Sequence, residues 1–201
     1  MDKLVHDTFY HIYNRGNNKE NIYYKDSNYI FFLQSLDSYL FPYLDLYSYC
    51  LLPNHFHLLI KTKSEETILK NGKINLKNVS FDEYGEIIGE IFRRFFMSYS
   101  KAINRQENRS GSLFKKLYQR KPINSDNYLI RTILYIHLNP VHHKLTEDFE
   151  TYRWSSYNKM LNQVKSKLRK NEVLDMFYGI ENYIKLHKEE RDLMVLRNEE
   201  L

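Results

Sequence analysis

The order of apolar and polar residues predicts strands and helices along most of the chain. Residues 8–14 mix β-branched and aromatic side chains, as strands do, and the turn at residues 15–18 ends this run. Residues 44–52 and 55–61 predict two more strands, and because only Pro53 and Asn54 separate them, they should form an antiparallel hairpin. Residues 113–123 are a fourth candidate strand.

Helical spacing of apolar residues predicts three helices in the same part of the chain. The first should be capped by Asp26 or Ser27 and closed by Pro42. Its apolar positions include Ile30, Phe31, Leu33, Leu36 and Leu40. The second should run over 84–104 and end before the break at 108–111, with apolar positions at Ile87, Ile88, Ile91, Phe95, Met97 and Ile103.

The third helix should be capped by Ser125 or Asp126 and run to about residue 138, because Pro140 stops it. Residues 62–82 lack a period and predict a loop or insertion. The resulting order β-α-β-β-α-β-α predicts an α+β fold, a ferredoxin-like antiparallel sheet with helices packed on it. We expect a domain over 1–150 and a helical C-terminal extension over 151–201.

Composition narrows the class of protein. With 42% hydrophobic residues, 6 Gly and 4 Pro in 201 residues, the chain is neither disordered nor collagen-like. The single cysteine, Cys50, excludes an intramolecular disulfide and a Cys-rich zinc site, which favours a reducing cytosol. No signal-peptide pattern and no apolar run approaching the roughly 20 residues of a membrane span is present. We therefore expect a cytoplasmic protein with no membrane partner.

Positive charge is concentrated in one segment. The formal net charge is +5, but residues 93–121 contain nine basic residues against one acid, Glu107, so this segment carries +8 and the rest of the chain −3. Such a run is either a solvated helix face or a surface that follows the phosphates of a nucleic acid. The nine are Arg93, Arg94, Lys101, Arg105, Arg109, Lys115, Lys116, Arg120 and Lys121. Arg15, beside Gly16 in the first turn, is a further candidate for nucleic-acid contact.

Two histidines stand two residues apart on the predicted third strand. Side chains two apart on a strand point to the same face, so His55 and His57 can direct both imidazoles to one point, while Phe56 points into the core. Histidine is the commonest metal ligand, which makes a divalent cation the first interpretation. A hydrogen-bonded pair at the surface is the alternative.

Tyr135 and Asn139 are four residues apart on the predicted third helix and therefore share a face. The tyrosine could act as a nucleophile and the amide oxygen as a neutral ligand. Both residues also have ordinary explanations, because a helical tyrosine usually packs and an Asn before Pro140 suits a helix end.

These short motifs, taken in order over roughly residues 9–154, resemble the single-tyrosine HUH transposases of the IS200/IS605 type, and more closely their REP-associated tyrosine transposase branch. The motifs are YHIYNRG at 10–16, YCLLPNHFH at 49–57, NR at 104–105, RSGSLF at 109–114, YIHLNPV at 135–141 and WSSY at 154–157. Several motifs in the right order are far more specific than any one of them.

The resemblance implies an enzyme that cleaves and rejoins single-stranded DNA next to hairpins. His55 and His57 would be the metal ligands, Tyr135 the nucleophile of a 5′-phosphotyrosine intermediate, and Mg²⁺ or Mn²⁺ the cofactor. Asn139 would be the third ligand, where related transposases usually carry Gln. The DNA would be a single strand with hairpin (REP-like) elements, bound by the basic segment, and the protein a monomer or homodimer.

Other interpretations stay open from the sequence alone. A hairpin-binding protein that does not cleave would need the same basic segment. A His-x-His metallohydrolase would need further ligands, for which His137, His142 and His143 are available without a familiar spacing. Tyr99 is the rival nucleophile, although it lacks an Asn one turn later. Phe114 and Tyr118 could stack unpaired bases, although core packing explains Phe114 better, and Trp154 should anchor the C-terminal extension.

Overall fold

Four strands form one antiparallel sheet in the computed structural model, which describes residues 3–70 and 81–199. The strands lie in the order β2-β3-β1-β4, the arrangement expected of a ferredoxin-like fold. They are β1 (Phe9–Arg15), β2 (Leu44–Leu52), β3 (His55–Thr62) and β4 (Gln119–Ile123). The predicted α+β class and the β2–β3 hairpin are therefore confirmed.

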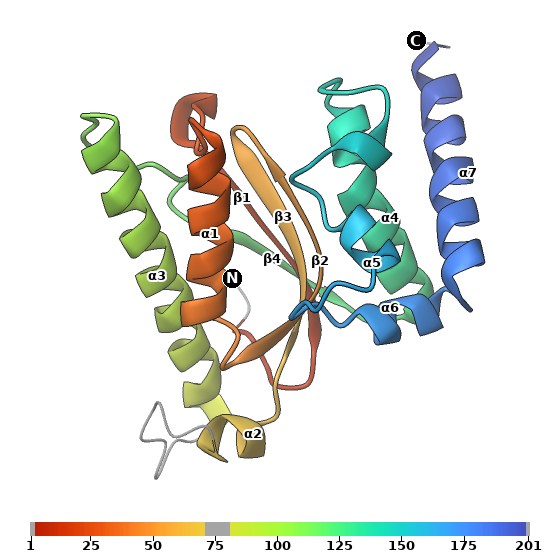
Figure 1. Cartoon of the computed structure of the whole chain (residues 1–201). Coiled ribbons are helices and arrows are strands. Elements are labelled where there is room, and N and C mark those ends of the chain that lie inside the picture. The colour runs from red at the N-terminus through yellow and green to blue at the C-terminus, as the bar shows by residue number, and fades with distance from the viewer. Residues whose placement is uncertain (1–2, 71–80, 200–201) are drawn as a thin grey trace.

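Helices cover both faces of the sheet (Figure 1). The helices α1 (Asp26–Tyr39) and α3 (Phe81–Gln106) lie on one face, and α4 (Asp126–His142) lies on the other. Shorter elements are α2 (Glu65–Lys70), the 3₁₀ turns at Asn17–Lys19 and Phe149–Thr151, α5 (Tyr157–Leu161) and α6 (Lys170–Met176), before the long α7 (Ile180–Glu199). No helix in the described part of the chain is long and apolar enough to cross a bilayer.

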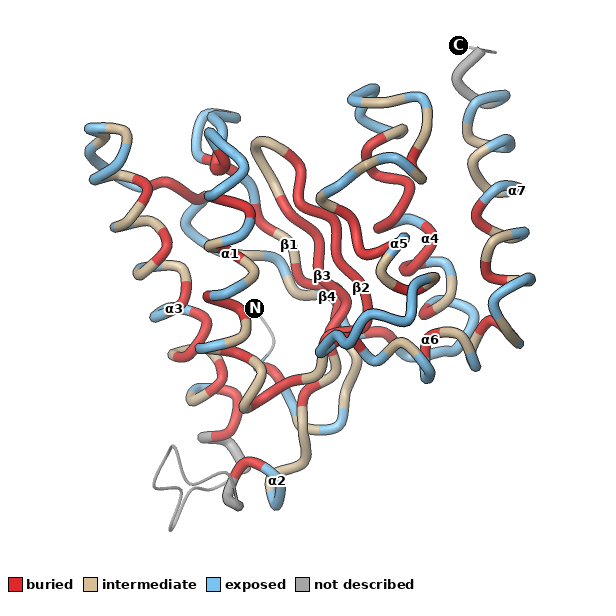
Figure 2. The backbone as a smooth tube through the Cα atoms, in the orientation of Figure 1, coloured by how far each residue is buried: buried red, intermediate tan, exposed pale blue. Residues whose placement is uncertain are grey.

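The main core lies between the sheet and the helices α1 and α3. Phe32 of α1 is fully buried and contacts Phe56 of β3 and Phe95 of α3, each at 5.1 Å between ring centres. The strands β2 and β3 are buried along almost their whole length (Figure 2). Because Phe56 points into this core, His55 and His57 must point to the opposite face, toward α4.

Two predicted core positions are wrong. Ile30 is 43% exposed and Met97 is 55% exposed. In α1 the buried apolar positions are Tyr29, Phe32 and the predicted Leu36, spaced three and four residues apart, so the buried face of the helix leaves Ile30 at the surface. The stretch expected to be a loop contains α2 and the first two residues of α3, and residues 71–80 lie outside the described residues.

Two predicted boundaries also differ. The fourth strand begins only at Gln119, because Leu113 and Phe114 are buried as part of the preceding loop, where Phe114 forms a single bridge with Gly16. The helix α4 continues through Pro140 to His142. A proline lacks only its own N–H, and one so close to a helix end removes a single hydrogen bond without breaking the turns before it.

The residues after α4 close the outer edge of the sheet. The backbone N–H of Leu51 donates to the carbonyl of Trp154, and the N–H groups of Ser156 and Arg169 donate to carbonyls of β2, at 2.9–3.0 Å. These bonds protect an edge strand that would otherwise be open to pairing with other chains. Trp154 stacks on Tyr29 at 4.3 Å between ring centres, which confirms its predicted role as an anchor.

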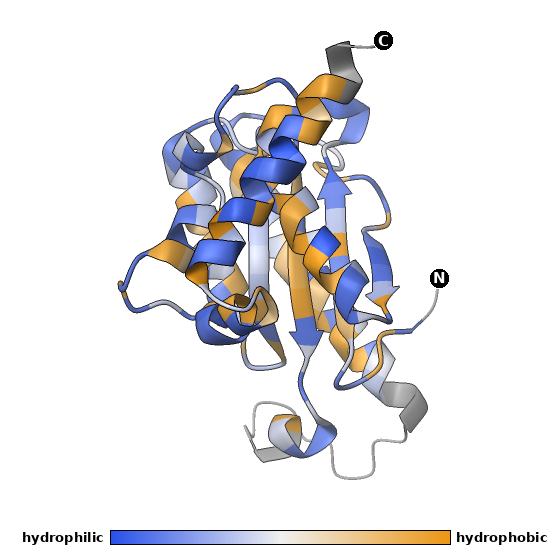
Figure 3. Cartoon of the chain, turned by 90° about the vertical axis from the view of Figure 1, so that its right-hand side faces the viewer, coloured by the Kyte–Doolittle hydropathy of each residue, from blue (hydrophilic) through white to orange (hydrophobic). Residues whose placement is uncertain are grey.

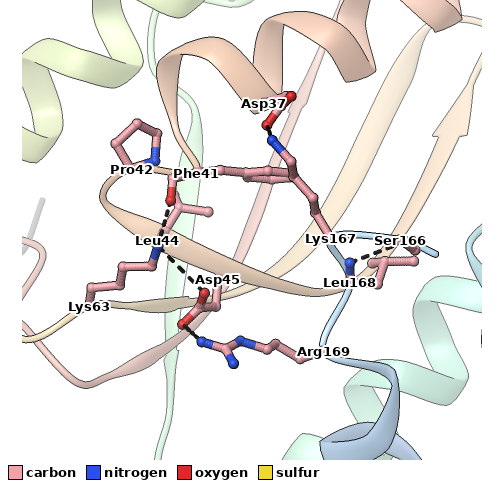
Figure 4. A pocket seen from close by; sticks show the side chains of 10 residues that line it. All are labelled: Asp37, Phe41, Pro42, Leu44, Asp45, Lys63, Ser166, Lys167, Leu168 and Arg169. Atoms are coloured by element: carbon pink, nitrogen blue, oxygen red, sulfur yellow. Dashed lines mark hydrogen bonds and ion pairs between the residues drawn. The ribbon is translucent and has the colours of Figure 1, made fainter. Parts of the chain in front are cut away.

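Ion pairs hold the same segment at the far end of β2 (Figure 4). Asp45 contacts Arg169 at 2.8 Å and Lys63 at 3.7 Å, while Lys167 pairs with Asp37. The hollow that these residues line therefore has its charges matched within the chain. This hollow lies where the C-terminal segment packs against the sheet.

A buried polar network joins α4 to α7, which crosses the outside of the molecule in Figure 3. The two ring nitrogens of His137 contact His187 Nε2 at 2.9 Å and Ser156 Oγ at 2.7 Å, and the hydroxyl of Tyr183 lies 3.2 Å from His137 Nδ1. All four residues are fully buried. The network explains His137 as a residue that fastens the C-terminal helices to the domain.

These buried imidazoles predict that acid weakens the fold. Burial lowers the pKa of His187 to about 4, and burial beside His187 lowers that of His137 well below its ordinary value. Below pH 6.5 the unfolded chain binds protons that the folded chain does not, so the free energy of unfolding falls as pH falls toward 4. The titration of His187 alone lowers the free energy of unfolding by about 3 kcal/mol. Urea unfolding at a series of pH values measures it.

The variant His187→Gln should show a shallower fall over the same pH range, because one of the titrating groups is gone. Val164→Ala, a change at a side chain that is 71% exposed and has no titratable group, is the control and should leave the slope as it is in the wild type. An unchanged slope in His187→Gln would contradict the prediction.

Candidate active site and nucleic-acid interface

The structure brings the two histidines of β3 together with Tyr135 of α4. The rings of His55 and His57 are 5.3 Å apart, and the ring of Tyr135 stands edge-on to His57 at 5.5 Å. Tyr135 is 39% exposed although its helix is packed on the sheet, so its hydroxyl can reach a ligand. The arrangement follows from the alternation of β3 and from the packing of α4 on β2 and β3.

Hydrogen bonds fix the orientation of His55. Asn54 Nδ2 donates to the carbonyl of Lys19 at 3.2 Å, which turns Asn54 Oδ1 toward His55 Nδ1 at 2.7 Å. An oxygen in that position accepts, so His55 Nδ1 carries the proton and Nε2 carries the lone pair. Nε2 is buried and has no hydrogen-bond partner among the described residues. It is therefore a preoriented ligand atom.

His57 is held in a similar way by the neighbouring strand. Its Nδ1 lies 2.9 Å from Nε2 of His11, a residue of β1 that is itself buried. Tyr13, the residue opposite His57 in the β1–β3 register, stacks on the same imidazole at 5.5 Å. The bond to His11 occupies Nδ1 and leaves His57 Nε2 for a ligand.

Burial keeps both imidazoles neutral. It lowers the pKa of His55 to about 4, helped by His143, Arg15 and His142. Burial also lowers the pKa of His57 well below its ordinary value, with His11 and His55 adding to the effect. Because a neutral imidazole is the form that binds a metal, the pair is ready to ligate at neutral pH.

Asn139 lies one turn after Tyr135 and is fully buried. Its Nδ2 donates to the carbonyl of Tyr135 at 2.8 Å, while Oδ1 is buried without a hydrogen-bond partner in the described chain. The described residues contain no cluster of three or more His, Cys, Asp or Glu that could hold a metal. Asn139 is not among the residues that line the cavity of His55 and His57. The donors at that cavity are two imidazoles, which fit a divalent cation that also binds water or phosphate, and the amide oxygen of Asn139 is a further unsatisfied acceptor.

A cavity of about 660 Å³ opens beside these residues, with Tyr135, His55 and His57 in its wall. Three cations also line it, Arg15, Lys19 and Lys115, and no acidic residue does. None of the three forms an ion pair within residues 3–70 and 81–199. A cavity with unmatched positive charge and neutral imidazoles suits a phosphate group.

The other predicted DNA-binding residues lie in several places. Arg93, Arg94, Lys101 and Arg105 belong to α3, on the face of the sheet opposite α4, and both Arg93 and Arg94 pair with Glu90. Arg109 pairs with Glu20 and bonds to Asn104, so it braces a turn. Lys116 is exposed in the loop before β4, Arg120 lies over the ring of Tyr118, and Lys121 lies over that of Tyr13.

The structure also shows where the residues named as alternative nucleophiles, base-stacking residues and metal ligands lie. Tyr99 is fully buried in the main core and donates its hydroxyl to the carbonyl of Ile22 at 2.8 Å, so it cannot attack a substrate. Phe114 is buried, and Tyr118 packs on Phe92 at 4.9 Å. His143 lines the cavity, with its ring 4.5 Å from that of His55.

Sequence reasoning missed the supporting residues His11, Tyr13, Asn54 and Lys19. A period of two along residues 8–14 already places His11 and Tyr13 on one face, but only the β1–β3 register shows that this is the face of His57. Lys19 has no sequence signal, because its position depends on the short 3₁₀ turn after β1.

No protein-family model matches the chain, and a search of curated proteins finds no significant match. Among solved structures, that of a REP-associated tyrosine transposase bound to a REP hairpin is similar, with a TM-score of 0.56. The match covers 83% of this chain and 87% of that chain at 12% sequence identity. At this identity the likeness establishes the architecture: the chain has the fold of a REP-associated tyrosine transposase.

Proposed function

We propose that the protein is a transposase-type nickase-ligase that cleaves and rejoins single-stranded DNA next to hairpins through a 5′-phosphotyrosine. One observation carries the proposal: an accessible phenol stands beside two neutral, oriented imidazoles in a cavity with unmatched positive charge. The similar solved structure is bound to a hairpin, which supports the substrate class. Residues 1–150 would form the catalytic domain and 151–201 its helical extension.

The reaction is a phosphoryl transfer between two alcohols. The oxygen of Tyr135 attacks the phosphorus, the bond to the 3′-oxygen breaks, and the phenol proton is finally carried by the released 3′-hydroxyl. No bond energy is lost to hydrolysis, because a phenolate is also a good leaving group and the 3′-hydroxyl can attack in return. Arg15, Lys19 and Lys115 hold the negatively charged strand in the cavity.

His55, His57 and Asn139 would hold a divalent cation, Mg²⁺ or Mn²⁺. When bound, such a cation would supply polarisation of the scissile phosphate and would offset charge that develops during attack. The residues themselves provide what such an ion needs: two imidazoles held in place by hydrogen bonds to Asn54 and His11, and an unsatisfied amide oxygen.

Incubation with Mn²⁺ and hairpin-bearing single strands tests the proposal. We expect a protein–DNA adduct that survives denaturation and that mass spectrometry maps to Tyr135. Salt-sensitive binding without an adduct, for every metal and strand tried, would replace this function with that of a hairpin-binding protein that does not cleave.

Asn54 offers a separate prediction about the cation site. In Asn54→Ala the imidazole of His55 loses the acceptor that fixes its tautomer and orientation, so we expect Mn²⁺ affinity to fall about 10- to 100-fold. Electron paramagnetic resonance of free Mn²⁺ measures the affinity without any need for activity. Asn158→Ala, a change on α5 away from the cavity, is the control. Equal affinities in the two variants would show that Asn54 does not position His55.

A further inference from the structure

The loop before β4 presents an apolar side chain at the rim of the cavity. Leu117 is 61% exposed, follows Lys115 and Lys116 directly, and lines the cavity with Lys115. The loop already has core anchors in Leu113 and Phe114, which are buried. Leu117 therefore contributes little to the core, and contact with the apolar face of a ligand would remove its surface from water.

The same cavity is also lined by an aromatic ring and a free amide. Tyr13 lies between His57 and Gln119 in the strand register and lines the cavity with both. Gln119 is exposed, and its side chain forms no hydrogen bond within the described part of the chain. A glutamine amide offers a donor and an acceptor together, which is the pattern needed to read the edge of a base.

The positive charges around the cavity indicate that the ligand also carries negative charge. Arg15 and Lys115 line the same cavity, and Lys121 lies 5.8 Å from the ring of Tyr13, so cations surround the apolar walls. Apolar and aromatic walls, one free amide and surrounding cations together match a base with its phosphates, because single-strand binding sites combine stacking with backbone contacts. A purely apolar partner would leave the cations unpaired.

We infer that this cavity is a subsite for one unpaired nucleotide next to the scissile phosphate. The inference rests on the proposed function. The base contacts Leu117 and Tyr13 and presents its edge to Gln119, and its phosphate points toward Tyr135 and the histidine pair. The protein thus selects the base beside the cleaved bond through residues that take no part in the chemistry.

An abasic scan in metal-free buffer tests the subsite without any cleavage. The probe is a pool of hairpin-bearing single strands with randomised flanks, enriched for binding to the wild-type protein. Flank positions of the selected strand are then replaced one at a time by an abasic residue. We expect one position to lower the affinity of the wild type about tenfold, as the loss of one stacked base does.

Leu117→Ser should bind the intact strand about tenfold more weakly, and the abasic replacement at that position should then cost nothing further. Gln119→Leu should relax the base preference at the same position. Leu193→Ser, which alters a leucine of α7 that is 47% exposed, should behave as the wild type. Equal abasic losses in the wild type and Leu117→Ser would overturn the subsite and leave the proposed function standing, whereas failure to enrich any hairpin strand would overturn both.

Discussion

The substitution Tyr135→Phe should abolish the covalent adduct, with a fall of at least about 10³-fold in its rate of formation. The change removes one oxygen atom, the one that attacks phosphorus, and leaves the ring that contacts His57 and His11. Affinity for hairpin-bearing strands should stay within about threefold of the wild type, because the cations of the cavity are unchanged. Denaturing gels with labelled strands measure the adduct, and fluorescence anisotropy measures binding.

Tyr128→Phe is the matched control, because Tyr128 belongs to the same helix and is 42% exposed. It should form the adduct at the wild-type rate. An adduct that persists in Tyr135→Phe would show that another residue is the nucleophile. Tyr99 is not available for that role, since its hydroxyl is buried in the main core and bonded to the carbonyl of Ile22.

The sequence predicts the order of strands and helices along the chain and the His55–His57 face well, because both depend on local periodicity. A period of two places Phe56 and the histidines on opposite faces whatever the rest of the fold does. Local periodicity does not determine which basic residues reach the site. Arg94 and Lys115 look alike in the sequence, yet α3 carries the first to the far face of the sheet and the loop before β4 brings the second to the cavity.

The support of the histidines could not be predicted for the same reason. Asn54 adjoins His55 in the sequence, but its role depends on the carbonyl of Lys19, 35 residues earlier, which orients the amide. His11 contacts His57 only because β1 and β3 pair in one particular register. Contacts between distant segments are set by the tertiary fold, and a short motif carries no information about them.

The second large effect is expected at His57. His57→Gln keeps a neutral side chain of similar size but removes a ligand nitrogen, so we expect Mn²⁺ affinity to fall roughly 100-fold or more. Adduct formation at a fixed Mn²⁺ concentration should fall in parallel. Urea unfolding of the metal-free variant shows whether the fold is kept, since His57 is buried against His11 and Tyr13.

The order of effects among neighbouring variants distinguishes a ligand from a positioning residue. His11→Gln and Asn54→Ala each disturb a hydrogen bond to a ligand imidazole but leave both ligand nitrogens in place, so their losses of Mn²⁺ affinity should be smaller than that of His57→Gln. Excess Mn²⁺ should restore adduct formation in these two variants and not in His57→Gln, because a weakened site can still be filled. Full rescue of His57→Gln by Mn²⁺ would mean that His57 is not a ligand and that its buried imidazole serves only to shape the cavity around Tyr135.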